Sequence, residues 1–257
     1  KMPEKLAAKS TAILWNLENY WSIDRQKQTY QWDAWNYPVK FLEMAKSLGA
    51  PVDVIPETTD FSKYKVLIVP AYELADSGLV KKWTNYAANG GHLILTCRTA
   101  TKNRLGHFWE GEWAAPISGL IGAKISATDM LSENSNGEII MNGSKYTWNN
   151  WADLVQPETN AEVVAAYENQ FYKGKSAVVQ RKVGKGSVTY IGVDTDDSRL
   201  EKDILKKIYT KAGATTENYP AGIYVYWRDG FYVAVNYSSD DYTMEVSETA
   251  KIWVGDK

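Results

Sequence analysis

The chain has 257 residues, of which 44% are hydrophobic, so it is long enough to bury a sizeable core. Its formal net charge of -2, from 29 basic and 31 acidic residues, gives no electrostatic footprint for nucleic acid or for an anionic membrane. A single cysteine excludes an internal disulfide, and with only two histidines the chain has few residues for a metal site. No apolar run approaches the roughly 20 residues that span a bilayer. We therefore expect no nucleic-acid or membrane partner and no metal ion.

The first half of the chain alternates short apolar runs with amphipathic segments. Continuous apolar runs at 11–17, 65–70 and 92–97 predict strands that are buried on both faces, as in a parallel sheet. Segments at 38–48 and 76–89 carry helix start and stop signals and predict helices between these strands. This order predicts an α/β fold with a mostly parallel, doubly wound sheet. No G-x-G-x-x-G pattern follows the first strand, so we expect no dinucleotide or flavin cofactor.

The second half contains further strand signals and one helix. Runs at 161–167, 176–183 and 187–193 predict strands, and Gly184-Lys185-Gly186 predicts a hairpin turn between the last two. Ser198 and Glu201 fit a capping box that opens a helix closed by Gly213.

Beyond residue 214 the pattern changes to short, often alternating strands. We expect these strands at 223–227, 231–237, 242–246 and 251–254. The sequence therefore predicts an α/β domain over residues 1–214 and a small β domain over residues 215–257. Because a β unit of this size is marginal alone, we expect it to pack on the first domain.

Two groups of residues could carry chemistry, and each also has a structural interpretation. Cys97 follows a predicted strand, where a nucleophile elbow would lie, but Thr96 and Arg98 flank it instead of glycines, which favours a buried structural cysteine. Asp194, Asp196 and Asp197 precede the Ser198 helix, where carboxylates stabilise a helix N-terminus more often than they bind a metal.

The most unusual feature of the composition is its aromatic content, with 11 Trp and 17 Tyr against 5 Phe. Trp and Tyr combine an apolar body with a polar group, which suits core packing, subunit interfaces and sugar-binding faces. We select five tryptophans as candidates for interface or sugar-proximal positions: Trp21, Trp32, Trp35, Trp109 and Trp113.

Several segments, in their order, resemble the β-galactosidases of glycoside hydrolase family 42. The similarity covers most of residues 11–195, and residues 222–257 are similar to the family's small C-terminal domain. It is carried by Leu14 to Trp21, Val52 to Pro56, Asp60 to Pro70, Asn89 to Thr96 and Gly184 to Gly192. The resemblance implies a trimerisation domain with a fold like class I glutamine amidotransferases but without amidotransferase activity.

The resemblance also implies where catalysis lies. In that family of retaining glycosidases, both catalytic glutamates lie on an N-terminal (β/α)₈ barrel, and no such barrel fits before Thr11. We therefore expect a barrel-less piece of a β-galactosidase, without catalytic residues of its own, that assembles a homotrimer and walls the galactoside cleft. A stand-alone carbohydrate-binding or scaffold protein and an amidotransferase-like enzyme using Cys97 are the alternatives. Cytoplasm and periplasm both stay open as the compartment.

Overall fold

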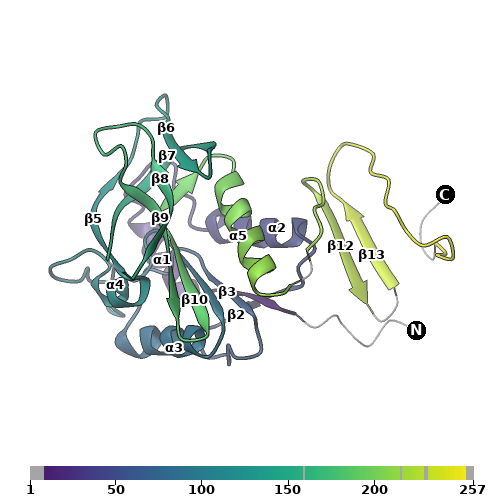
Figure 1. Cartoon of the computed structure of the whole chain (residues 1–257), viewed down its shortest axis with the longest axis horizontal. Helices are drawn as coiled ribbons and strands as arrows, with labels where there is room; N and C mark the ends of the chain where they lie inside the picture. Colours follow the sequence, from purple (N-terminus) through teal and green to yellow (C-terminus); the bar gives the residue numbers. More distant parts are fainter. Residues whose placement is uncertain (1–8, 159, 215, 229–230, 253–257) are drawn as a thin grey trace.

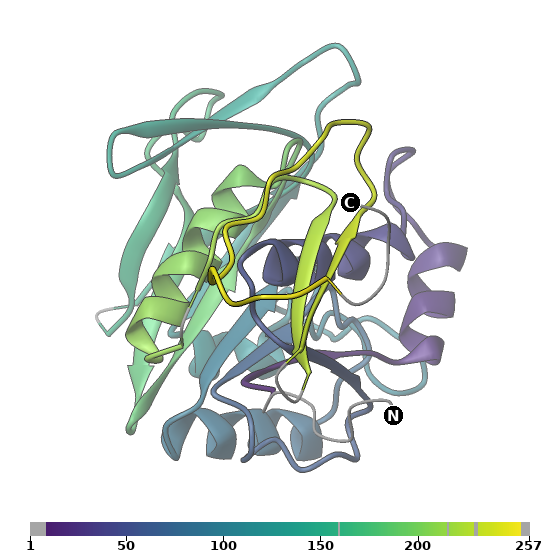
Figure 2. The ribbon, with the colours of Figure 1, turned by 90° about the vertical axis from the view of Figure 1, so that its right-hand side faces the viewer.

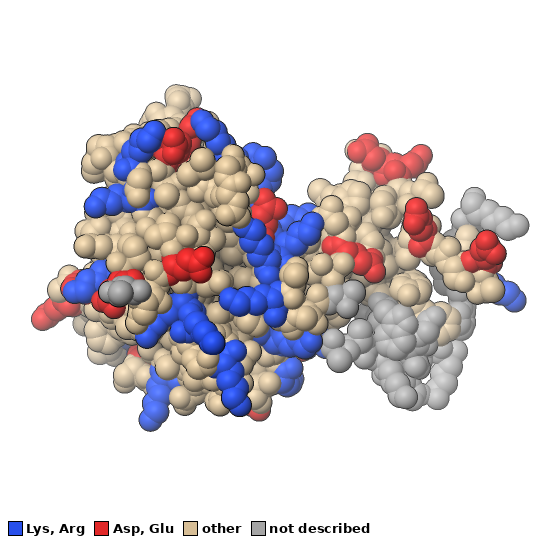
Figure 3. Space-filling model, in the orientation of Figure 1, with Lys and Arg blue, Asp and Glu red and all other residues tan. Residues whose placement is uncertain are grey.

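One mixed sheet organises the chain in the computed structural model, which describes residues 9–158, 160–214, 216–228 and 231–252. Within these residues the sheet has 11 strands, and a separate two-stranded sheet follows near the C-terminus (Figure 1). Among the described residues, no helix is long and apolar enough to cross a bilayer. Basic and acidic side chains are interspersed on the face shown in Figure 3, in keeping with the balanced charge of the sequence.

The parallel half of the sheet contains the apolar runs that the sequence predicts. Neighbouring strands here all run in the same direction, and their side chains are almost completely buried except on the outer strand. In sheet order these are β2 (Val52–Ile55), β1 (Thr11–Leu14), β3 (Val66–Val69), β4 (His92–Thr96) and β10 (Gly186–Ile191).

The other half of the sheet is antiparallel, so the prediction of a mostly parallel sheet is wrong for this half. It begins at β9, which the predicted hairpin joins to β10. Its strands are β9 (Ser176–Val183), β8 (Glu162–Tyr167), β6 (Gly137–Met141), β7 (Ser144–Pro157), β5 (Ala123–Asp129) and β11 (Val193–Thr195). Strands β5, β6 and β7 were not predicted, because their polar and apolar residues form no clear run.

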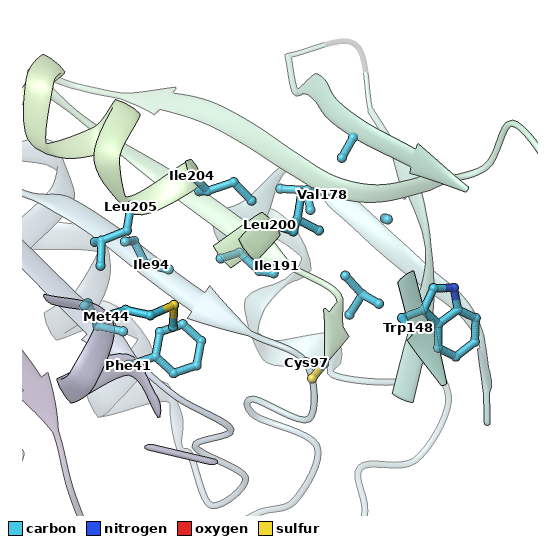
Figure 4. Close-up of a cluster of buried hydrophobic side chains, with 14 of the residues drawn as sticks. Phe41, Met44, Ile94, Cys97, Trp148, Val178, Ile191, Leu200, Ile204 and Leu205 are labelled. Atoms are coloured by element: carbon cyan, nitrogen blue, oxygen red, sulfur yellow. The ribbon is translucent and has the colours of Figure 1, made fainter. Parts of the chain in front are cut away.

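Helices cover both faces of the sheet, which confirms the α/β class that the sequence predicts. Alternate strand residues point to opposite faces: Ile13 and Ile68 pack in one core cluster, and Leu14 and Leu67 in the other. Helices α2 (Asn36–Ser47) and α5 (Arg199–Lys211) cover the first cluster, part of which Figure 4 shows. Helices α3 (Ser77–Ala88) and α4 (Ala115–Ile121) cover the second.

Local start signals explain some helices and not others. Asp76 caps α3, since its carboxylate accepts a 2.8 Å hydrogen bond from the Leu79 N–H. The capping box at α5 does not form, because Ser198 has a φ of 58° and makes no side-chain cap bond. Helix α1 (Leu17–Arg25) was not predicted, although Asn16 caps it through the Asn19 N–H.

The C-terminal part is smaller than predicted. It forms β12 (Ile223–Arg228) and β13 (Phe231–Asn236), of which β12 contacts α2 and β13 lies on the side of β12 away from α2 (Figures 1 and 2). The strand predicted at 242–246 is absent, and residues 251–252 are also outside any strand, while 253–254 lie outside the described residues. Backbone hydrogen bonds from Glu217 and Tyr219 to the end of α2 attach this part to the large sheet unit.

Candidate functional site

The parallel strands β1, β3, β4 and β10 all end at one edge of the sheet, which we call the carboxyl edge. The chain segments that follow them there are residues 15–35, 70–76, 97–114 and 192–198. Open α/β sheets place their ligands and contacts at this edge. The carboxyl edge is therefore the candidate site.

Three charged side chains are buried together at the carboxyl edge: Glu73, Arg98 and Lys102. Lys102 Nζ lies 2.9 Å from Glu73 Oε2, and Arg98 Nη2 lies 3.5 Å from Glu73 Oε1. Ser22 of α1 donates a 2.8 Å hydrogen bond to the same carboxylate. Two cations therefore depend on one buried carboxylate, which also links α1 to the segments after β3 and β4.

Arg98 additionally holds the segment that follows α1. Its terminal nitrogens donate to the backbone carbonyl oxygens of Lys27 at 2.6 Å and Gln26 at 3.0 Å. The guanidinium lies over the rings of Trp32 and Trp151, 4.6 and 4.8 Å from their centroids. Arg98 has a φ of 66°, a conformation that a non-glycine residue adopts only when its surroundings hold it there. These contacts make Arg98 the anchor of the 15–35 segment.

A second charged cluster joins α2, α5 and the segment after β10. Lys40 contacts the Asp194 carboxylate, and its Nζ lies 3.0 Å from Glu201 Oε1. Burial alone would lower the pKa of Lys40, but the negative charges of Glu201 and Asp194 have the larger combined effect and raise this pKa above its ordinary value. Lys40 is therefore a structural cation and not a candidate nucleophile. It lies beside an open polar hollow of about 400 Å³.

Asp153 of β7 is fully buried, and β7 pairs with β11, the strand that contains Asp194. Trp151 Nε1 donates to it at 2.9 Å and the Tyr190 hydroxyl at 2.6 Å. Burial raises the pKa of Asp153 from 3.8 to about 6, although both hydrogen bonds and the Arg98 charge oppose the rise. Asp153 is thus a buried group that changes charge near pH 6.

Three of the five selected tryptophans lie in the 15–35 segment, with different environments. Trp21 and Trp35 are 55% and 54% exposed, whereas Trp32 is only 2% exposed. The Trp32 ring packs against Tyr37 and Trp151, with centroid distances of 4.5 and 5.9 Å. Trp32 therefore contributes to the core, and only Trp21 and Trp35 present their rings at the surface.

The other two, Trp109 and Trp113, lie in the segment after β4 and line a separate hollow. This hollow has a volume of about 550 Å³ and is closed on its other side by β5. Trp113 stacks between Phe108 and Trp151, at centroid distances of 5.4 and 6.4 Å. Through Trp151 the stack reaches the Arg98 anchor, so the two groups of tryptophans meet inside the molecule.

Cys97 has the surroundings of a packing residue. It is completely buried in the core shown in Figure 4, and burial raises the pKa of its thiol well above the ordinary value. His92 lies at the opposite end of β4 and contacts Ser187, and His107 lies in an exposed turn. The described residues thus provide no nucleophile–base pair for an amidotransferase-like reaction.

The acidic triplet does not converge on one point. Asp194 pairs with Lys40, while Asp197 accepts a 3.0 Å hydrogen bond from the Arg199 N–H at the start of α5. In the part of the chain that the structure describes, no group of three or more His, Cys, Asp or Glu could hold a metal ion. Asp194 therefore serves an ion pair and Asp197 the start of a helix.

The buried polar groups Glu73, Arg98, Lys102 and Asp153 are not among the candidates that the sequence indicates. The sequence could have indicated two of them, because Glu73 and Arg98 follow within a few residues the ends of buried apolar strands. Charged residues that follow parallel strands lie together at the carboxyl edge, however far apart they are in the sequence.

Comparison with known proteins assigns the family. Residues 9–217 match the family model described as "Beta-galactosidase trimerisation domain". The chain belongs to this trimerisation-domain family. The match confirms the resemblance that the sequence motifs indicate.

Relatives of this trimerisation domain carry the name beta-galactosidase. Beta-galactosidase BgaH of Haloferax lucentense is 27% identical over 248 residues, covering 96% of this chain and 37% of its own length. The solved beta-galactosidase of Halorubrum lacusprofundi superposes with a TM-score of 0.87 at 26% identity, covering 93% of this chain and 36% of that chain. The structure of Gan42B, a GH42 beta-galactosidase, superposes with a TM-score of 0.77 at 26% identity, covering 86% of this chain and 33% of that chain. The chain spans about a third of the length of these relatives.

Proposed function

We propose that this trimerisation domain assembles subunits of a family 42 β-galactosidase into a homotrimer and that its carboxyl edge walls the galactoside site of a catalytic part. The family match and the names of the relatives support the assembly role. The proposal assigns hydrolysis to the part of such relatives that this chain does not span. No residue described above receives a catalytic role.

An exposed group of apolar side chains at the carboxyl edge carries the proposal. Leu17 and Trp21 lie four residues apart on one side of α1 and are 47% and 55% exposed. Trp35 lies beside this helix and makes edge contacts with Trp15 and Tyr20, at centroid distances of 5.2 and 5.9 Å. We call Trp15, Leu17, Tyr20, Trp21 and Trp35 the aromatic patch. Exposed clusters rich in Trp and Tyr are typical of protein contact surfaces.

The aromatic patch rests on a fixed support. Asn19, on the inner side of α1, donates to the Ala71 carbonyl oxygen at 3.3 Å and accepts from the Leu74 N–H at 2.9 Å. Arg98 holds the backbone just after the helix. Because these bonds form within one chain, the patch is ordered before it meets a partner, which lowers the entropic cost of association.

Removing both exposed rings should weaken assembly strongly. We expect Trp21→Ala combined with Trp35→Ala to raise the subunit dissociation constant about 100-fold, since two central aromatic contacts contribute roughly 3 kcal/mol. Light scattering over a dilution series measures the change. Phe171→Ala is the matched control, because Phe171 is 91% exposed but lies in the turn before β9, outside the patch. An oligomer equally stable in both variants would contradict the assignment of this surface.

The isolated chain is expected to leave a chromogenic β-galactoside unhydrolysed. Within the described residues, the buried carboxylates are all held by other groups: Glu73 by Arg98 and Lys102, Glu201 by Lys40, and Asp153 by the Trp151 indole and the Tyr190 hydroxyl. An assay of the purified chain at neutral pH checks this, with a blank reaction as the reference. Hydrolysis well above the blank would contradict the assignment of catalysis to another part of such enzymes.

A further inference from the structure

We infer that the 550 Å³ hollow between residues 108–114 and β5 is a saccharide-binding site that is complete within one chain. Its volume lies in the range of small-molecule pockets, about 300–1,000 Å³. Two tryptophans, Trp109 and Trp113, form one wall, and Ser126 and Thr128 of β5 lie on the other. Strand β5, which contributes to the lining, lies beside α4 in Figure 1. The lining includes no residue of the aromatic patch, so the site is independent of the assembly role.

The two tryptophans have different parts in this wall. Trp113 is fixed by stacking between Phe108 and Trp151. Trp109 takes part in no ring stack within the described residues, so no other aromatic ring uses its π-face. A sugar ring presents C–H groups on one face, and an aromatic ring that no other ring covers is suited to pack against them.

Unused hydrogen-bonding groups surround the hollow. Thr128 and Gln156 line the hollow, and neither side chain makes a hydrogen bond within the part of the chain that the structure describes. Sugar hydroxyls, which both donate and accept, match this hydroxyl and amide pair. The indole N–H groups of Trp109 and Trp113 are buried without an acceptor among the described residues, as are those of Trp32, Trp83 and Trp148 in the core, so the two tryptophans contribute their ring faces to the hollow.

The charges and the strand geometry exclude other ligand classes. Glu112 and Lys124, the charged residues of the lining, form a 2.5 Å ion pair with each other, so the hollow has no excess charge for an anion or a cation. An extended peptide would need a regular strand edge on β5. Ser126 is the extra residue of a β-bulge there, and Ile125 already pairs with Trp113. A neutral saccharide therefore fits this hollow better than a peptide.

The site is tested by titrating the full chain with lactose, β-1,4-galactobiose and cellobiose. Calorimetry measures binding, and NMR follows the indole N–H resonances of the tryptophans. We expect saturable binding of at least one disaccharide, with shifts of the Trp109 and Trp113 resonances. These two resonances are assigned from the peak that disappears in Trp109→Phe and in Trp113→Phe. Trp109→Ala should lower the affinity about tenfold, and Trp109→Phe, which keeps a ring but loses the N–H, about threefold.

Variants away from the tryptophans keep the test independent of folding defects. Gln156→Ala, on the exposed side of the hollow, should weaken binding, whereas Trp21→Ala, in the aromatic patch, should leave the affinity unchanged. Absence of binding by all three disaccharides, shifts confined to other indoles, or saturation by an extended peptide instead of a sugar would overturn the inference. Light scattering on the same samples reports assembly separately, so failure of this site and failure of the assembly proposal are distinguishable.

Discussion

Glu73→Gln is expected to lower the free energy of unfolding by about 3–5 kcal/mol, the usual cost of breaking a buried ion pair from one side. The substitution keeps the size of the side chain but removes the negative charge that Arg98 and Lys102 share. Both cations stay buried, with 0% and 2% exposure, and cannot regain water without opening the carboxyl edge. Urea denaturation measures the loss.

A matched control separates the charge effect from the change of residue. Glu138 pairs with Lys145 on the surface, so Glu138→Gln should cost at most about 1 kcal/mol. A second variant, Glu73→Gln with Lys102→Met, removes one of the stranded cations and should recover part of the stability. If Glu73→Gln and Glu138→Gln had equal effects, the buried cluster would not support the fold in the way described.

Asp153→Asn is expected to change how stability depends on pH between about pH 4 and pH 6. The folded-state pKa of Asp153 is raised from 3.8 to about 6, so in this window the folded chain binds more protons than the unfolded chain. Stability contributed by Asp153 is therefore complete at low pH and falls as pH rises, by about 3 kcal/mol in total. Asparagine keeps an oxygen acceptor for the Trp151 indole and cannot ionise, but its amide nitrogen cannot accept the hydrogen bond that the Tyr190 hydroxyl donates to Asp153. Losing that bond shifts the stability of the variant by an amount that does not depend on pH. The stability of the variant relative to the natural chain should therefore rise by about 3 kcal/mol between pH 4 and pH 7.

Denaturation of both proteins across this pH range measures the difference. Asp76→Asn provides a control of opposite sign, because the Leu79 N–H at the helix cap lowers the pKa of Asp76 below its ordinary value. Stability contributed by Asp76 is present at neutral pH and is lost as pH falls. Parallel stability curves for the natural chain and Asp153→Asn would show that Asp153 is not a buried ionising group.

The parallel half of the fold could be predicted because its signals are local. Its inner strands are buried on both faces and therefore appear as continuous apolar runs, such as 66–69 and 92–96, whereas the outer strand β2 is only partly buried and forms no such run. In the antiparallel half, β8 and β9 were also predicted, but β7 depends on partners distant in sequence. In the middle of β7, Asn150 breaks the apolar pattern, and its side chain finds its partner in Asp194, 44 residues away. Propensity at such positions is decided by the neighbouring strand and not by the local sequence.

The candidate site was predictable in composition but not in arrangement. Trp21, Trp32 and Trp35 are close in sequence, yet only Trp32 is buried, because the Arg98 guanidinium and Trp151 lie against its ring. Similarly, Glu201 has the spacing of a capping box with Ser198. Its carboxylate turns instead to the Thr195 N–H, at 3.1 Å, and to Lys40. Long-range ionic contacts override both local patterns.

Native mass spectrometry of the purified chain tests the central claim, assembly, most directly. The proposal predicts a species of three times the 29.0 kDa of one chain, which Trp21→Ala with Trp35→Ala converts to monomer and Phe171→Ala leaves intact. A natural chain that stays monomeric at all concentrations, or an oligomer that survives loss of both exposed tryptophans, would contradict the proposed role of the aromatic patch.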